Sequence, residues 1–308
     1  MGNFLSRTCP LCAGSETERV MAKGDLTLVR CRRCSMIYAN PVPAEMAEGT
    51  FYDRAGAEYL SEEKVGSDYA DVRFERELRL FRTYCSRGSV LDVGCSSGAF
   101  LYQLKKRFPG DYEILGTDVS SAPLDYAAKM GVPVRQGDFL AQSFDRKFEA
   151  VTFWAVMEHL SEPRRLLEKA AAILKPGGHC FVLTPNMNSL AVRLLGSKYR
   201  YILVEHLNYF TPATLKKFVE LEFTAVEMKS THFNPLVIWK DFRGGARDVP
   251  RAERSEMLRR TTAYKQSPWM LPARLGYRLT ERLLGGMFLA DNVAIVGRNQ
   301  ECVISNLK

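Results

Sequence analysis

The sequence predicts an α/β protein built around a doubly wound, mostly parallel sheet of seven strands. Short apolar strands alternate with amphipathic helices through the middle of the chain, and a glycine-containing turn joins the first of these strands to the first helix. Two cysteine pairs precede the sheet, and about 60 residues separate its last two strands. We therefore divide the chain into a cysteine-bearing module, a linker with helices, a central α/β domain, a helical insertion, and a last strand with a tail, at residues 1–45, 46–85, 86–231, 232–291 and 292–308.

The composition excludes several classes of protein. Hydrophobic residues make up 46% of the 308 residues and charged residues 25%, which is typical of a folded chain and not of a disordered one. No apolar run reaches the ~20 residues that a membrane-spanning helix requires. The first residues lack the apolar core of a secretory signal, so we expect a cytoplasmic protein. Eight cysteines in such a chain favour metal or thiol chemistry over disulfides.

The net charge of +8 is unevenly distributed. Residues 1–192 hold 24 basic and 24 acidic side chains, whereas residues 193–308 hold 19 basic and 11 acidic ones. A basic segment beside a neutral body indicates one localised anionic partner more than general affinity for nucleic acid. Three interpretations of the insertion remain open. It is a cap whose arginines bind an anionic acceptor, a peripheral contact with an anionic membrane, or a solvated face or dimer contact.

Two C-x2-C pairs near the start of the chain predict a metal site. Eighteen residues separate the pairs, and the two residues within each pair allow both thiolates to face one ion. Four thiolates form a closed tetrahedral site that suits zinc, so we expect a structural zinc-ribbon module without catalytic function. Its ligands are Cys9, Cys12, Cys31 and Cys34.

The central region has a regular order of elements. Residues 90–100 read VLDVGCSSGAF, a strand followed by a turn of small residues and the start of a helix. Further strands are expected at 114–118, 132–134, 148–153 and 180–184, with a helix opening at Pro163 and stopped by Lys175-Pro176-Gly177-Gly178. A carboxylate at Asp118, twenty residues beyond Gly98, can accept hydrogen bonds from both hydroxyls of a ribose.

The chain resembles the class I S-adenosylmethionine-dependent methyltransferases, and more narrowly the bacterial group that carries an N-terminal four-cysteine zinc-binding module. The resemblance rests on GCSSG, GTDVS, GDF, EHL and LKPGG in this order between residues 90 and 185, and on EHLNYF with TPATL at 205–215. It implies a Rossmann-like sheet and S-adenosylmethionine as cofactor. Ser96 departs from the pattern, because the family usually has glycine there.

The resemblance also implies roles for individual residues. Four residues of the turn should border the methionine part of the cofactor, and Asp92 should orient that turn, directly or through water. Asp118, followed by Val119, should hold the ribose. Asp138 should accept from the adenine amino group with Phe139 against the ring, and Phe153 and Trp154 should line the cofactor side of their strand. The four turn residues are Gly94, Cys95, Ser96 and Gly98.

Few side chains can act as the base that an alcohol or phenol acceptor needs, because the chain has only four histidines. His159 and His206 follow expected strands at the sheet edge where ligands bind, and we expect one of them to be the base. Glu205 and Tyr209 are candidate supporting groups. His179 and His232 are expected away from the site, because one starts a strand and the other ends one.

These observations favour methyl transfer to a small molecule, O-directed rather than N- or C-directed. Candidate acceptors are a sugar, a nucleotide-linked sugar or a secondary metabolite, with an anionic acceptor suggested by the basic insertion. An RNA methyltransferase that binds phosphates through its zinc module and basic third is the alternative. The neutral first 192 residues count against it. A non-catalytic interaction module is a third hypothesis, and the sequence leaves the oligomeric state open.

Overall fold

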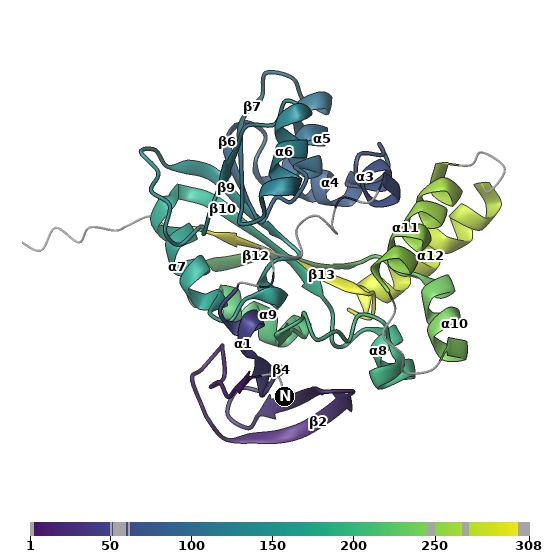
Figure 1. The fold of residues 1–308 in the computed structure, drawn as a ribbon. Helices are drawn as coiled ribbons and strands as arrows, with labels where there is room; N and C mark the ends of the chain where they lie inside the picture. Colours follow the sequence, from purple (N-terminus) through teal and green to yellow (C-terminus); the bar gives the residue numbers. More distant parts are fainter. Residues whose placement is uncertain are drawn as a thin grey trace, which may run out of the picture.

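The computed structural model describes residues 3–49, 51, 60, 62–244, 250–266 and 271–300. A seven-stranded sheet in the order β12-β13-β10-β9-β6-β7-β8 forms its centre (Figure 1). The five strands from β6 to β10 run parallel, and β13 runs antiparallel between β10 and β12. This confirms the mostly parallel, Rossmann-like sheet. The strands are β6 (Gly88–Val93), β7 (Tyr112–Asp118), β8 (Val134–Gln136), β9 (Phe148–Trp154), β10 (Leu174–Pro185), β12 (Thr224–Thr231) and β13 (Asn292–Arg298).

Helices cover both faces of the sheet, so its central strands are buried on both sides. On one face, Phe81 and Phe100 pack with Phe181 of β10. On the other face, Leu167 and Phe218 share a core with Phe153 of β9. The helices of the first face are α4 (Glu75–Tyr84), α5 (Ala99–Arg107) and α6 (Ser121–Lys129), and those of the second are α7 (Pro163–Ile173) and α9 (Pro212–Val219).

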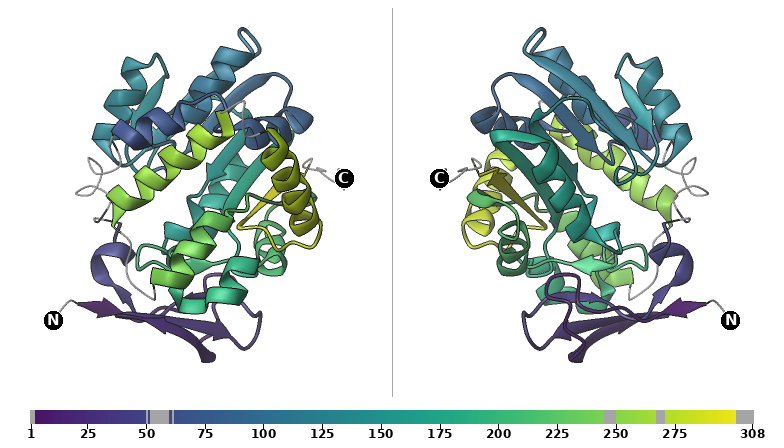
Figure 2. Two further views of the ribbon diagram at one scale, coloured as in Figure 1. Left: turned by 90° about the vertical axis from the view of Figure 1, so that its right-hand side faces the viewer. Right: turned by 90° about the vertical axis from the view of Figure 1, so that its left-hand side faces the viewer.

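The N-terminal module is joined to the central domain through a shared sheet and a shared core. Its strands β2 (Thr17–Lys23), β3 (Leu26–Cys31) and β4 (Ile37–Ala39) pair in order, and β11 (Asn208–Tyr209) of the central domain pairs with β4 as the fourth strand. Met36 and Tyr38 belong to the same buried cluster as Phe218. The module therefore lies against one end of the domain (Figure 2) and shares part of its core. Around it lie β1 (Phe4–Leu5), β5 (Val42–Pro43) and α1 (Ala44–Ala47).

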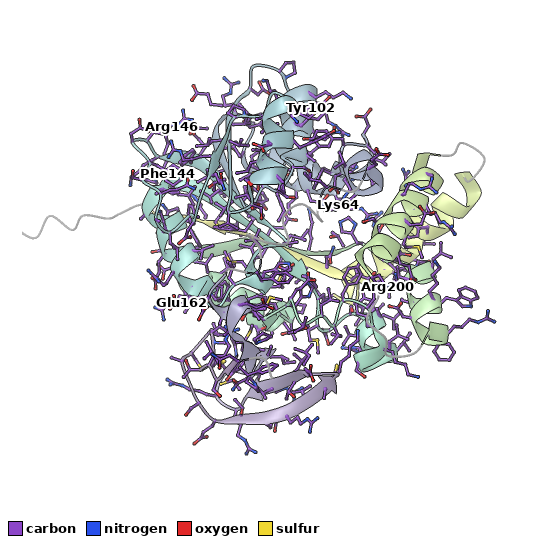
Figure 3. The ribbon with its side chains drawn as sticks, in the orientation of Figure 1. Lys64, Tyr102, Phe144, Arg146, Glu162 and Arg200 are labelled. Atoms are coloured by element: carbon purple, nitrogen blue, oxygen red, sulfur yellow. The ribbon has the colours of Figure 1, made fainter. Side chains whose placement is uncertain are left out.

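The insertion before the last strand is helical, as the sequence indicates. It contains α10 (Pro235–Gly244), α11 (Arg251–Gln266) and α12 (Leu271–Gly286), and α11 packs against α3 (Glu62–Asp68) of the linker. Arg200, beside α10 in Figure 3, forms a buried ion pair with Asp241 of that helix (Nη2–Oδ1 2.6 Å). Between β10 and β11 lie α8 (Leu190–Leu195) and the short helix η3 (Gly196–Lys198). Residues 245–249, 267–270 and 301–308 lie outside the described part of the chain, as do the side chains of Tyr264, Trp269, Arg274 and Leu275.

The helices in the described part of the chain include none that is long and apolar enough to cross a membrane.

Candidate active site

A cavity of about 1660 Å³ opens at the carboxyl ends of the parallel strands. Its lining comes from the turn after β6, the ends of β7 and β9, the residues after β8, and the helical insertion. Pockets for a single small ligand measure about 300–1,000 Å³, so this cavity has room for a cofactor and an acceptor together. The insertion lines the cavity with Phe233, Thr261 and Tyr277, which supports its interpretation as a cap.

The turn after β6 adopts the left-handed backbone that brings its amides close to the cavity. Gly94 has φ 70°, and a Cβ atom there would lie 2.6 Å from Cγ2 of Val156. Gly94, Cys95 and Ser96 line the cavity. Gly98 does not, because it faces α6, where a Cβ atom would lie 2.9 Å from Cβ of Ala127. The structure thus assigns Gly98 to the packing of α5 against α6, and its expected place beside the cofactor stays a prediction.

Ser96 also lies in the left-handed region, with φ 49°. This conformation costs a residue with a Cβ atom about 1–2 kcal/mol, and glycine avoids that cost but loses more entropy on folding. We expect Ser96→Gly to raise the free energy of unfolding by up to about 1 kcal/mol, measured by denaturant titration. Ser97→Gly is the matched control and should lower it, because Ser97 has no positive φ to relieve. Equal changes in the free energy of unfolding for Ser96→Gly and Ser97→Gly would show that the positive φ of Ser96 carries no cost.

Asp118 holds the turn to the end of β7. One carboxylate oxygen accepts from the backbone N–H of Ser96 at 2.9 Å and the other from Ser120 at 3.0 Å. Burial raises the pKa of Asp118, and these backbone donors oppose the shift. Asp92 accepts from the hydroxyl of Thr152 at 2.6 Å, and burial raises its pKa to about 7. The direct hydrogen bond to the turn thus comes from Asp118 and not from Asp92, because Asp92 faces the neighbouring strand β9.

The other residues expected to contact the cofactor divide into two groups. Val119, Asp138, Phe139 and Trp154 line the cavity. Phe153 does not, because neighbouring residues of a strand point to opposite faces of the sheet. Its side chain is fully buried and packs against Phe139 with the ring centroids 6.1 Å apart. The expectation that Phe153 lines the cofactor side is corrected accordingly.

His159 and His206 lie next to each other on the cavity wall, although 46 residues separate them. Their ring centroids are 4.8 Å apart. Nδ1 of His159 lies 3.0 Å from the backbone oxygen of Glu205. A carbonyl can only accept, so Nδ1 carries the proton and Nε2 of the neutral ring carries the lone pair. The tertiary structure therefore orients a basic nitrogen at the cavity wall.

Glu158 completes this cluster. Its side chain is almost fully buried, and burial raises its pKa to about 8. Oε1 lies 4.0 Å from Nε2 of His159, and Oε2 has no hydrogen-bond partner among the described residues. One ligand atom from each of Glu158, His159 and His206 lies within 4.8 Å of the others, an arrangement that could also hold a divalent cation.

The two supporting residues expected from the sequence do not line the cavity. The hydroxyl of Tyr209 donates to the backbone oxygen of Leu203 at 2.7 Å and accepts from its N–H at 3.2 Å. Tyr209 is buried there because its backbone forms part of β11. Glu205 contributes its backbone carbonyl to His159. Both residues thus shape the loop that carries His206, and neither lines the cavity itself.

His232 lies on the cavity wall, contrary to expectation. Both β10 and β12 run antiparallel to β13, so they run parallel to each other and their carboxyl ends lie at the same edge. A residue directly after β12 therefore reaches the cavity. Its Nε2 lies 2.7 Å from Oε1 of Glu77, which also lines the cavity. The sequence could have predicted this position, because a residue that follows the carboxyl end of a parallel strand lies at the edge where ligands bind.

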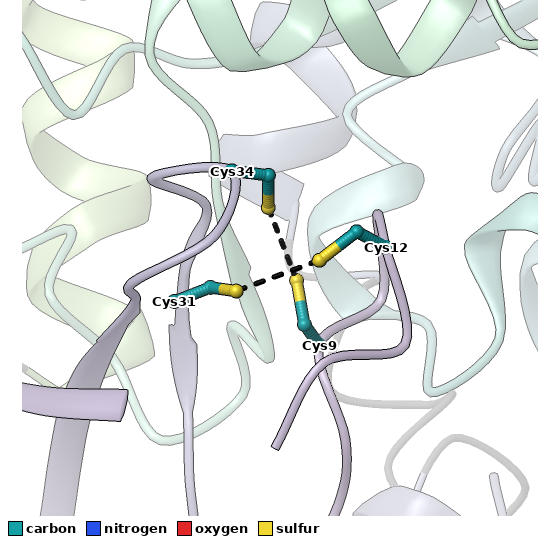
Figure 4. A group of neighbouring side chains, drawn as sticks. All are labelled: Cys9, Cys12, Cys31 and Cys34. Atoms are coloured by element: carbon teal, nitrogen blue, oxygen red, sulfur yellow. Dashed lines mark hydrogen bonds between the residues drawn. The ribbon is translucent and has the colours of Figure 1, made fainter. Parts of the chain in front are cut away.

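The four N-terminal cysteines converge on one point (Figure 4). Sγ of Cys9 lies 3.4 Å from Sγ of Cys34, and Cys12 and Cys31 are 3.5 Å apart. Zinc–sulfur bonds of about 2.3 Å at tetrahedral angles separate the sulfurs by ~3.8 Å, so these residues fit a zinc ion. The two knuckles have the same backbone pattern, in which the residue four positions after Cys9 or Cys31 donates to that cysteine's carbonyl. The donors are the N–H groups of Ala13 and Ser35.

Comparison with known families identifies the central domain. The family profile described as a methyltransferase domain matches residues 68–221, half of the chain. The chain belongs to this methyltransferase family. With the cavity at the carboxyl ends of a Rossmann-like sheet, it is an S-adenosylmethionine-dependent methyltransferase.

Curated relatives are similar over the same part of this methyltransferase. The ubiquinone biosynthesis O-methyltransferase of Acinetobacter baylyi is 28% identical over 167 residues, which cover 48% of the chain and 68% of the relative. The protein of the same name from Alkalilimnicola ehrlichii is 30% identical over 163 residues, covering 48% and 65%. The alignments thus span about two thirds of the relatives' length.

Solved structures show the same fold. A methyltransferase of Thermotoga maritima, described as a possible histamine N-methyltransferase, has a TM-score of 0.53 at 18% identity and covers 82% of this chain and 99% of its own. The [4+2]-cyclase SpnF has a TM-score of 0.54 at 16% identity, covering 84% and 97%. Proteins of this fold therefore catalyse different reactions, and the acceptor chemistry has to be argued from the cavity.

Proposed function

We propose that this methyltransferase transfers the methyl group to an oxygen atom of a small-molecule acceptor. The observation that carries the proposal is a single cavity that joins the cofactor turn to an oriented histidine. An O-directed reaction requires removal of a proton from the acceptor hydroxyl, and a histidine at the cavity wall can accept it. The curated relatives, named O-methyltransferases, support the same choice.

S-adenosylmethionine, when bound, supplies a methyl group activated by its sulfonium. We propose that the backbone of residues 94–96 borders its methionine part and that Asp118 holds its ribose. Two oxygens of a carboxylate offer about four lone pairs, and backbone N–H groups occupy two of those of Asp118. The remaining lone pairs are available to ribose hydroxyls. Asp138 accepts from Leu140 N–H through one oxygen, which leaves the other available to the adenine amino group beside Phe139.

The proton acceptor in this proposal is Nε2 of His159. The carbonyl of Glu205 fixes the ring orientation, and Oε1 of Glu158 lies 4.0 Å from the accepting nitrogen. His206 packs edge-on against the ring and restricts its movement. These contacts position the base, so the residues around His159 have a defined function in an in-line displacement.

The four-cysteine cluster holds a structural zinc ion in this proposal. It is closed by four protein ligands, of which Cys9, Cys31 and Cys34 are buried, so it has no open position for a substrate. The strand β4 next to it pairs with β11, which begins two residues after His206. The zinc module thus supports the loop that forms one wall of the cavity.

Asp118→Ala tests the cofactor assignment. A hydrogen bond to a charged group contributes about 1.5–3 kcal/mol, so we expect the dissociation constant for S-adenosylmethionine to rise about 10- to 100-fold in calorimetry. Asp125→Ala is the matched control, because Asp125 is exposed on α6 and does not line the cavity. An unchanged dissociation constant in Asp118→Ala would show that Asp118 does not hold the cofactor. Release of S-adenosylhomocysteine with hydroxyl acceptors then tests the reaction itself.

A chelation experiment separates direct proton transfer from metal assistance. Activity that survives removal of added divalent cations supports His159 as the direct base. Activity that is lost on mild chelation and restored by Mg²⁺ would overturn it, and would make Glu158, His159 and His206 ligands of a catalytic cation.

A further inference from the structure

One wall of the cavity is built by three separate segments. Glu77 comes from α4, His232 follows β12, and Asp291 precedes β13. Oε1 of Glu77 lies 2.7 Å from Nε2 of His232, and the N–H of Asp291 donates to the backbone oxygen of His232 at 2.7 Å. The two ends of the insertion are therefore joined at this wall.

Two carboxylate oxygens of this wall have no hydrogen-bond partner among the described residues. They are Oε2 of Glu77, a side chain only 6% exposed, and Oδ1 of Asp291. Burial alone would raise the pKa of Glu77, but His232 and Arg73 hold it at about 2, so the group is ionised at neutral pH. Burial raises the pKa of Asp291 to about 7. A buried acceptor without a donor costs about 1–3 kcal/mol, which a donating ligand group would offset.

The charge of the lining points the same way. Two arginines of α12, Arg278 and Arg282, are exposed and do not line the cavity. The positive charge that they give the insertion therefore lies outside the cavity. Lys64 of α3 (Figure 3) and Arg73 line the cavity but both pair with Asp68. Among described lining residues only Lys64, Arg73 and Arg165 are basic besides histidines, against the carboxyl groups of Glu48, Asp68, Glu77, Asp92, Asp118, Asp138, Glu158, Glu162 and Asp291.

We propose that Glu77, His232 and Asp291 form the acceptor subsite and that it binds a hydrogen-bond-donating group, an ammonium or a pair of hydroxyls, of an acceptor without negative charge. This inference rests on the proposed function, because it assigns the substrate class of the same cavity. An ionised phosphate or carboxylate has no donor to offer, so at this wall it would leave Oε2 of Glu77 and Oδ1 of Asp291 without a partner, which is unfavourable. The anionic acceptor expected from the net charge is therefore replaced by a neutral or cationic one.

The neighbouring side chains fit the body of such an acceptor. Tyr199, Tyr201, Phe233 and Tyr277 also line the cavity. The hydroxyl of Tyr277 donates to the backbone oxygen of Phe233 at 2.6 Å, so the ring is held in place. Aromatic faces pack against the apolar surface of a ring or chain, while the carboxylates bind its donors.

Three sugars that differ at few atoms test the subsite. Glucosamine, glucose and glucuronate present an ammonium, a hydroxyl and a carboxylate on similar rings, and their binding is measured by saturation-transfer NMR with S-adenosylhomocysteine present. We expect glucosamine and glucose to bind at least tenfold more tightly than glucuronate. Preference for glucosamine over glucose would assign an ammonium, and equal binding would assign a hydroxyl pair. Tighter binding of glucuronate, or no binding of any of the three, would overturn the proposal.

Two variants locate the effect at this wall. We expect Glu77→Gln and Asp291→Asn each to weaken glucosamine or glucose binding about tenfold while leaving the dissociation constant for S-adenosylmethionine unchanged. Glu113→Gln, at an exposed ion pair with Arg146, is the control and should change neither. Thermal melting checks that each variant is folded. If both variants bind the sugars like the wild type, the subsite lies elsewhere.

The readout separates this inference from the proposed function. Binding is measured without turnover, so a failed subsite leaves methyl transfer intact. If instead no hydroxyl acceptor yields S-adenosylhomocysteine although the sugars bind as expected, the proposed reaction fails and the subsite stands.

Discussion

Replacing Cys31 with serine is expected to remove zinc from the N-terminal module and to abolish most methyl transfer. Cys31 is 1% exposed and is one of four sulfur atoms that converge on the ion site. Structural zinc contributes about 10–16 kcal/mol to the folding of small domains, so loss of a ligand should lower the free energy of unfolding by about 4 kcal/mol or more. Metal analysis and denaturant titration measure the two effects.

The effect should reach the active site because the module and the loop carrying His206 are built together. Two N–H groups of the Arg7 guanidinium donate to the backbone oxygens of Leu207 (3.3 Å) and Ser161 (2.8 Å). The N–H of Ala39 in β4 donates to the same oxygen of Leu207 at 2.9 Å. An unfolded module would release these three hydrogen bonds. The segments that carry His159 and His206 would then lose their fixed spacing.

The control for this prediction is another buried cysteine. Cys85 lies at the end of α4, outside the four-cysteine cluster, and Cys85→Ser should retain the zinc and most of the activity. A Cys31→Ser protein with full zinc content would refute the metal site. Normal activity without zinc would show that the module does not support the catalytic loop.

His159→Ala is expected to lower kcat by about 10²- to 10⁴-fold, the range found for removal of a general base. The dissociation constant for S-adenosylmethionine should stay within about twofold, because the expected cofactor contacts come from the turn after β6 and from Asp118. Steady-state kinetics with a methyl acceptor measure kcat, and calorimetry measures the dissociation constant for S-adenosylmethionine. Added imidazole should restore part of the lost rate, since it can occupy the space and accept the proton.

His179→Ala is the matched control. His179 lies in β10 outside the cavity lining, with its ring 5.4 Å from that of Tyr84, so kcat should be nearly unchanged. If His159→Ala retains full turnover, the proton acceptor is another group and the assignment fails. If His159→Ala loses S-adenosylmethionine affinity as much as it loses turnover, His159 acts by stabilising the structure of the active site.

Several features followed from the sequence because they depend on short stretches of chain. The C-x2-C spacing, the small residues at 94–98 and the carboxylate at Asp118 each depend on local geometry, and the structure brings the cysteines together and places Asp118 at the end of β7. Other assignments depended on the face of the sheet toward which a side chain points. Phe153 and Trp154 are neighbours on one strand, yet only Trp154 reaches the cavity. The sequence predicts that neighbouring residues of a strand point to opposite faces of the sheet. It does not predict which of the two faces borders the cofactor.

The net charge shows the same division. The sequence by itself determined that the basic excess lies in the last third of the chain, since charge is a sum over residues. Only the tertiary structure decided that this excess faces outward at Arg278 and Arg282 while carboxylates line the cavity. The pairing of Glu77 with His232, 155 residues apart, likewise depends on the insertion returning to the sheet edge. Residue type and spacing determine which chemistry a chain can perform, whereas long-range packing determines which groups meet and which charges are buried.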